Sequence, residues 1–203
     1  MPLPGRDEFR SAVLQYVELP GAKLFRALKF TPNGITIFGF LITVVSAYLV
    51  GSGWLLAGGI VFLFAGALDL MDGGLARLTG QASPFGALMD SVFDRLSEAS
   101  IFVGIAVYAL RDDMSDDRQI FFITVLLLAL IFSQGVSYLR ARGEGLGVFT
   151  KAGLMTRPER VVLLCVGLII GQIEWILLAI AVVSCFTLFQ RLFTIRDMLD
   201  KTG

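Results

Sequence analysis

Residues 68–99, "LDLMDGGLARLTGQASPFGALMDSVFDRLSEA", combine two largely apolar stretches with two pairs of aspartates. The aspartates are Asp69, Asp72, Asp90 and Asp94. Between the pairs stands "TGQASP" (79–84), a run of residues that is typical of a turn. The stretch therefore predicts two antiparallel helices that bring their acidic ends together across a short connection.

The composition is that of a membrane protein. Of the 203 residues, 56% are hydrophobic and only 17% are charged. A helix needs about 20 mostly apolar residues to cross roughly 30 Å of hydrocarbon, and the chain has several such runs. We therefore predict an all-α integral membrane protein with six transmembrane helices. Their expected ranges are 35–50, 54–78, 85–110, 119–139, 160–170 and 175–195.

Residues 1–33 are expected to form an interfacial region ahead of a six-helix transmembrane domain, residues 34–199. Four apolar side chains recur there at helical spacing among charged ones: Phe9, Val13, Tyr16 and Val17. This pattern predicts an amphipathic helix in the membrane interface, broken near Pro20. A soluble helix packed on the bundle is the alternative. A cleaved signal peptide is not expected, because the region has no continuous apolar core.

The distribution of lysine and arginine predicts the orientation. With six spans, 15 of the 17 cations fall on the side of the two termini, and only Arg111 and Arg118 fall on the other. Loops rich in lysine and arginine stay in the cytoplasm. We therefore expect a multi-pass protein of the cell membrane with both termini and the acidic site on the cytoplasmic side.

The absence of some residue types limits which side chains can act as an acid, a base or a metal ligand. The chain has no histidine, and Cys165 and Cys185 both lie in apolar runs, where a thiol is usually a packing residue. An acid, a base or a metal ligand must therefore be a carboxylate or a weaker group. The chain has no phosphate-binding GxxxxGK[ST] loop, and no nucleic-acid partner is expected.

Helical periodicity gathers the four aspartates. Asp69 and Asp72 are three residues apart and share a helix face with small residues, while Asp90 and Asp94 are four apart on the next helix. All four lie at one level near the cytoplasmic side. Carboxylates this close repel one another, and a divalent cation relieves that repulsion. Oxygen ligands favour Mg²⁺ or Mn²⁺, and four carboxylates are enough for two ions.

Other interpretations of these acids remain open. A single intramembrane aspartate can be a structural hydrogen-bonding residue, and a group of them can form a cation or proton pathway in a transporter. The acids share one level, however, and the outer halves of the predicted spans carry no continuing charges. Arg77, one turn after Gly73, adds a cation suited to phosphate oxygens. A phosphate-transferring enzyme accounts for all of these features.

The pattern Asp69-x2-Asp72-Gly73-x2-Ala76-Arg77-x8-Gly86-x3-Asp90-x3-Asp94 resembles the signature of the CDP-alcohol phosphotransferase family, without a gap or a substitution. The segment "TPNGIT" (31–36) at the entry to the first span and the six-span layout are also similar to that family. The resemblance implies that an acceptor hydroxyl attacks the β-phosphorus of a CDP-linked lipid such as CDP-diacylglycerol and that CMP leaves. It also implies a homodimer.

The resemblance implies roles for particular residues. The first ion would be held by Asp69, Asp72 and Asp90, and the second by Asp69, Asp90 and Asp94. Asp94 would also be the catalytic base toward the acceptor hydroxyl. The positions implied for CDP-lipid binding are Pro32, Asn33, Gly34, Ile35, Gly73, Arg77 and Ser83.

The acceptor is predicted from a cationic cytoplasmic segment. "SYLRARGEGLG" (137–147), followed by "RPER" (157–160), is similar to the phosphatidylinositol-phosphate synthases of this family and their archaeal counterparts. That similarity implies inositol 1-phosphate as the phosphorylated alcohol. Its phosphate would be held by Arg140, Arg142, Arg160 and a C-terminal arginine, Arg191 or Arg196. Glycerol 3-phosphate, the acceptor of a phosphatidylglycerophosphate synthase, and the archaetidylinositol-phosphate synthase reaction are the alternatives. Positive-inside topology alone also explains these cations.

Overall fold

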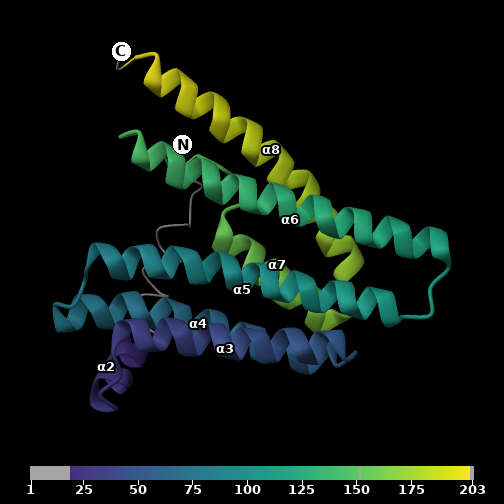
Figure 1. Cartoon of the computed structure of the whole chain (residues 1–203), viewed down its shortest axis with the longest axis horizontal. Coiled ribbons are helices and arrows are strands. Elements are labelled where there is room, and N and C mark those ends of the chain that lie inside the picture. The colour runs from purple at the N-terminus through teal and green to yellow at the C-terminus, as the bar shows by residue number, and fades with distance from the viewer. Residues whose placement is uncertain (1–18, 151, 202–203) are drawn as a thin grey trace. The chain divides into compact units, whose positions relative to one another are not determined.

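The described part of the chain is entirely helical. The computed structural model describes residues 19–150 and 152–201, and within these it contains seven α-helices and no strand (Figure 1). The helices are α2 (Leu19–Ala27), α3 (Pro32–Gly51), α4 (Leu55–Thr79), α5 (Pro84–Arg111), α6 (Asp116–Gly145), α7 (Arg157–Ile170) and α8 (Ile173–Leu199). The all-α prediction is therefore confirmed for these residues.

Each of the six predicted spans corresponds to one of the helices α3 to α8. Four of them, α3, α4, α6 and α8, are long and apolar enough to cross a membrane. Helix α7 has only 14 residues, which at 1.5 Å per residue cover about 21 Å. Helix α5 has 28 residues, but its first 15 residues include Asp90, Asp94, Arg95 and Glu98. Helix α5 therefore differs from these four helices in its charged residues, and helix α7 differs from them in its short length.

The structure describes the N-terminal region only from residue 19 onward. Helix α2 begins at Leu19, with Pro20 in its first turn, where the missing proline N–H leaves no helical hydrogen bond unmade. The apolar residues at positions 9–17 that predicted an interfacial helix lie outside the described residues. Helix α2 ends at Ala27, and the turn after it contains Lys29, which has a left-handed φ of 58°. The Phe30 N–H donates to the Phe25 carbonyl at 3.0 Å.

The chain forms two compact units, and the first contains the aspartates. It comprises the residues up to Val45 and Val61–Ser100, hence α2 and the adjacent ends of α3, α4 and α5. Its buried core is made by Ala22, Ile35, Leu68 and Leu75. The rings of Phe40 and Phe93, 5.3 Å apart, join α3 to α5. The apolar contacts thus fix the three helix ends around the acidic residues.

The second unit comprises Ser46–Ile60 and the residues from Ile101 onward, and α6 and α8 run parallel within it. Arg118 and Glu174, near the starts of these helices, form an ion pair at 2.8 Å. Near their ends, Gly143 lies against Ile195. Helix α7 returns the chain between them, from a capping box of Thr156 and Glu159 to the left-handed Gly171. The Cβ that Gly167 lacks would lie 2.9 Å from Ile176, so glycine permits the close approach of α7 to α8.

Candidate active site

Three aspartates meet between α4 and α5. Asp69, Asp72 and Asp90 each have a carboxylate oxygen within 4.8 Å of those of the other two. Asp72 is only 6% exposed, and the other two are partly buried. The prediction that two neighbouring helices bring acids from both pairs together is confirmed for these residues. Asp94, one turn beyond Asp90 on α5, lies outside this three-residue group.

The local sequence explains the pairing of the helices. Gly80 ends α4 with a φ of 67°, a left-handed conformation that glycine adopts without strain. Pro84 begins α5, where its fixed φ suits the first helical turn. The Ser83 hydroxyl accepts a hydrogen bond from the Gly86 N–H at 3.0 Å, so it caps the new helix. The short turn leaves the two acidic helix ends side by side.

The three carboxylates suit a hard divalent cation. Mg²⁺ binds oxygen ligands at about 2.0–2.1 Å, so oxygens that share one ion lie roughly 3–4 Å apart. The observed upper limit of 4.8 Å is close to that spacing. The group contains no nitrogen or sulfur ligand, which argues against zinc and copper.

One carboxylate of the group has an additional partner on α3. The Thr36 hydroxyl donates to Asp72 Oδ2 at 2.5 Å, and both side chains are buried. Thr36 is the last residue of the segment "TPNGIT" (31–36), but the sequence predicted no role for it. No spacing rule could have found this contact, because 36 residues separate the two partners.

Some of the residues predicted to hold the CDP group lie close to one another. The Cβ that Gly86 lacks would lie 3.2 Å from Ser83 Oγ and 3.4 Å from Asn33 Oδ1, so the start of α3 lies beside the start of α5. The site of a Cβ on Gly73 lies 3.5 Å from the Arg77 guanidinium, which therefore folds back along α4.

The predicted CDP-lipid residues in the first turn of α3 differ in their exposure. Pro32, Asn33 and Gly34 are partly exposed, and the Gly34 N–H is capped by the Thr31 hydroxyl at 3.1 Å. The Ile35 side chain is fully buried in the core of the first unit, so only the backbone of this residue can meet a ligand.

The five predicted acceptor arginines, all in the second unit, differ in burial. Arg160 is fully buried, and it donates to Ser137 Oγ at 3.2 Å and to the Met155 carbonyl. Arg191 is 3% exposed, and it donates to the Val136 carbonyl at 2.7 Å and twice to the Ala152 carbonyl. Arg140 and Arg160 lie near enough to Arg191 to repel it electrostatically. The structure thus brings these three arginines together.

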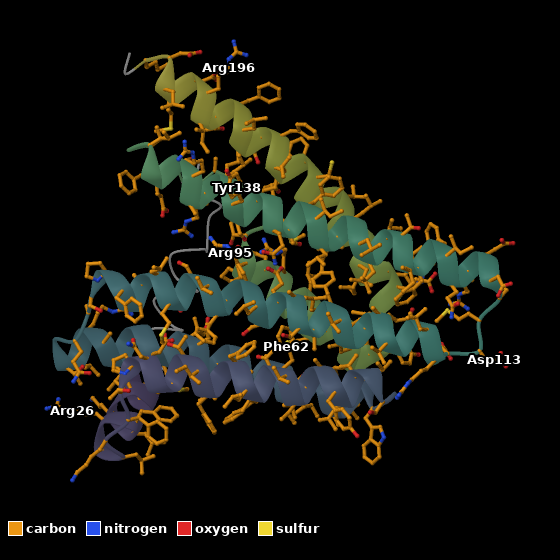
Figure 2. The ribbon with its side chains drawn as sticks, in the orientation of Figure 1. Arg26, Phe62, Arg95, Asp113, Tyr138 and Arg196 are labelled. Carbon is orange, nitrogen blue, oxygen red and sulfur yellow. The ribbon has the colours of Figure 1, made fainter. Side chains whose placement is uncertain are left out.

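The other two predicted acceptor arginines are exposed, as is Arg140. Arg142 lies near the end of α6. Arg196 projects outward from the end of α8, 3.6 Å from Asp200 (Figure 2). The prediction named Arg191 or Arg196 as the C-terminal member of the cluster, and Arg191 is the one that lies near Arg140 and Arg160.

The helical fold and the carboxylate group define a class of enzyme. The family model described as CDP-alcohol phosphatidyltransferase matches residues 29–187, and the chain belongs to this family of transferases. The resemblance seen in the aspartate pattern is thereby confirmed, and the transporter alternative is wrong.

Individual members of the family are similar to this chain over most of its length. The archaetidylinositol phosphate synthase of Pyrococcus horikoshii is 36% identical over 96% of this chain and 98% of its own. The phosphatidylinositol phosphate synthase of Mycobacteroides abscessus is 35% identical over 82% of this chain and 78% of its own. A crystal structure of the Mycobacterium tuberculosis phosphatidylinositol phosphate synthase with CDP-DAG bound has a TM-score of 0.79 and 30% identity, over 88% of this chain and 93% of that one. The same enzyme has been crystallised with manganese and citrate.

Proposed function

We propose that this protein transfers the phosphatidyl group of CDP-diacylglycerol, or the corresponding group of a related CDP-lipid, to a hydroxyl of inositol 1-phosphate and releases CMP. The group formed by Asp69, Asp72 and Asp90 carries the proposal, because it supplies a cation site suited to a diphosphate. The relatives named as synthases of phosphatidylinositol phosphate and archaetidylinositol phosphate support the choice of acceptor.

The proposed metal centre takes two ions, Mg²⁺ or Mn²⁺. Asp69, Asp72 and Asp90 would hold the first, and Asp69, Asp90 and Asp94 the second. The manganese-bound structure of the mycobacterial relative supports this choice of metal. Bound there, the ions would neutralise the charge of the diphosphate and favour attack at phosphorus.

Asp94 is the proposed catalytic base. Its carboxylate takes the proton of the acceptor hydroxyl as that oxygen forms a bond to the β-phosphorus, and the bond from this phosphorus to the bridging oxygen of CMP breaks. Its place one turn beyond Asp90 supports a role beside the three-carboxylate group rather than within it. A positioned carboxylate suffices for such a transfer in a chain without histidine.

We assign the CDP group to the polar residues around the helix starts. Asn33 and Ser83 meet at Gly86, and Arg77 lies along α4 next to Gly73, whose missing side chain leaves room for a phosphate. The first-turn N–H groups of α3, together with the arginine, would favour a bound anion. Pro32, Gly34 and the Ile35 backbone complete the proposed CDP-lipid contacts.

The acceptor phosphate is assigned to the arginines. Arg140, Arg160 and Arg191 lie close together, and all the hydrogen bonds described for Arg191 end on neutral carbonyl groups. These three bonds use three of the five N–H donors of a guanidinium. The charge of Arg191 therefore remains available to an anion, while Arg142 and Arg196 would form an outer cationic rim.

We further propose that all six helices α3 to α8 cross the cell membrane, with both termini and the site in the cytoplasm. The parallel course of α6 and α8 supports this topology, because a chain that crosses twice in one direction must return between. Helix α7 makes that return. Residues 1–33 would form the interfacial region, residues 34–199 the catalytic domain, and two chains a homodimer.

The reaction is tested by release of CMP from CDP-diacylglycerol. The purified protein is supplied with Mg²⁺ and, in separate assays, inositol 1-phosphate, glycerol 3-phosphate or free inositol. We expect turnover with inositol 1-phosphate and little with the other two. Equal or greater turnover with glycerol 3-phosphate would replace the acceptor assignment by that of a phosphatidylglycerophosphate synthase. Absence of CMP release with every acceptor, from a monodisperse protein, would contradict the proposed activity.

A further inference from the structure

A single hydroxyl connects the start of α3 to the metal site. Thr36 Oγ1 lies 2.5 Å from Asp72 Oδ2 and 3.2 Å from the carbonyl of Pro32, one turn earlier in its own helix. The Thr36 side chain is only 7% exposed, so water does not compete strongly for these contacts. A hydroxyl has one proton, and it can donate to only one of the two acceptors at a time.

The distances indicate that the proton goes to Asp72. Hydrogen bonds from a hydroxyl to an ionised carboxylate are typically about 2.5–2.7 Å long and roughly twice as strong as neutral ones. The 3.2 Å separation from the Pro32 carbonyl is longer than the usual range for a hydroxyl donor. The bond to Asp72 therefore determines where the Thr36 hydroxyl points.

We propose that Thr36 is a positioning residue that presents Asp72 to the metal through one oxygen only. This inference rests on the proposed metal site. Because the hydroxyl donates to Oδ2, we assign the other oxygen, Oδ1, to an ion shared with Asp69 and Asp90, whose carboxylates lie within 4.8 Å of that of Asp72. Partners that hold a ligand in this way fix its orientation and commonly change metal affinity by about 10- to 100-fold.

The packing around Thr36 makes it a suitable support. Its neighbour Ile35 is fully buried against Leu68 and Leu75 of α4, so the first turns of α3 are anchored on the helix that carries Asp72. Threonine is branched at Cβ, which restricts the side-chain rotation that would turn the hydroxyl away. The support is therefore rigid on both sides of the hydrogen bond, as a precise metal site requires.

Mn²⁺ binding tests the proposal without the reaction. Free Mn²⁺ is titrated by electron paramagnetic resonance against the purified full chain in the absence of lipid. Thr36→Val keeps the shape of the side chain and removes the hydroxyl, so we expect Mn²⁺ affinity to fall by about 10-fold or more. Thr36→Ser keeps the hydroxyl and should stay within a few-fold of the wild type.

Thr43 supplies the matched control. It is 2% exposed on the same helix, but its hydroxyl donates at 3.1 Å to the carbonyl of Gly39. Thr43→Val thus removes an equally buried hydroxyl from α3 and should leave Mn²⁺ affinity unchanged. In an Asp72→Asn background, Thr36→Val should add less than about twofold, because coupled residues are not additive.

Each alternative result has a separate meaning. Unchanged Mn²⁺ affinity in Thr36→Val, with normal binding by the wild type, overturns the role of Thr36 and leaves the proposed function intact. Equal losses in Thr36→Val and Thr43→Val, or a full additional loss in the Asp72→Asn background, also overturn it, because both point to general damage to the helix. A wild-type protein that binds no Mn²⁺ overturns the proposed metal centre together with this inference.

Discussion

The two units of this protein cluster side chains of opposite charge. In the first, carboxylates of Asp69, Asp72 and Asp90 lie close to one another, and the neutral Thr36 hydroxyl donates a hydrogen bond to Asp72. In the second, arginines gather, and Arg191 is fixed by neutral carbonyl groups. Neutral partners hold a charged side chain in place without cancelling its charge. This contrast agrees with the proposed ligands, which are a cation in the first unit and a phosphate in the second.

The largest effect is expected from neutralising one acid of the first unit. Asp90→Asn should reduce CMP release below detection and weaken Mn²⁺ binding, because Asp90 is assigned to both ions. The control is Asp113→Asn, in the exposed loop between α5 and α6 (Figure 2), which should keep wild-type activity. Both proteins are checked for a single peak in size-exclusion chromatography. Magnesium-dependent turnover by Asp90→Asn would exclude it as an essential ligand.

Asp94→Asn tests the distinction between holding the ions and moving the proton. We expect the single-turnover rate to fall by on the order of 10²-fold or more, the usual contribution of a positioned base. CDP-lipid affinity should stay close to that of the wild type, because Asp69, Asp72 and Asp90 remain. Equilibrium binding and rapid-quench measurements separate the two quantities. If lipid affinity is lost as completely as in Asp90→Asn, Asp94 acts as a ligand and not as the base.

Replacing Arg191 tests the second unit. Arg191→Met removes a charge and three hydrogen bonds, so we expect a higher KM for inositol 1-phosphate by about 10-fold and a lower melting temperature. Arg196→Met is the control, because Arg196 is exposed and its contact with Asp200 is weak. It should change the KM by less than about twofold. A lower melting temperature with an unchanged KM would make Arg191 a purely structural residue.

Local periodicity accounts for what could be predicted from the sequence. The six apolar runs gave the helices α3 to α8, and spacings of three and four residues placed the aspartates on helix faces, because both features depend on neighbours along the chain. The turn between Gly80 and Pro84 then determined which faces meet. Helix ends were less accurate, and α6 continues six residues past its predicted end at 139, because "RARGEG" is polar but remains helical.

Contacts between distant segments account for what could not be predicted. The bond from Thr36 to Asp72 depends on the packing of α3 against α4, which no spacing encodes. The sequence assigned all five arginines to the acceptor phosphate alike, since a charge pattern does not distinguish an exposed guanidinium from a buried one. Arg160 and Arg191 are buried, Arg142 and Arg196 are exposed, and this difference arises from the packing of α6, α7 and α8.

The smallest effect is expected from the acid that accompanies the arginines. Glu144 forms an exposed ion pair with Arg140 at 2.9 Å and attracts Arg191, so it partly offsets the positive charge of the cluster. Glu144→Gln should therefore lower the KM for inositol 1-phosphate by about twofold, since exposed pairs contribute less than about 1 kcal/mol. The gain should disappear at high salt, where exposed charges are screened. Glu174→Gln is the matched control, because Glu174 pairs with Arg118 at 2.8 Å near the starts of α6 and α8. Steady-state kinetics at low and high ionic strength measure both variants. If Glu144→Gln instead raises the KM, Glu144 orients Arg140 for the phosphate, and the charge of the cluster alone does not determine acceptor binding.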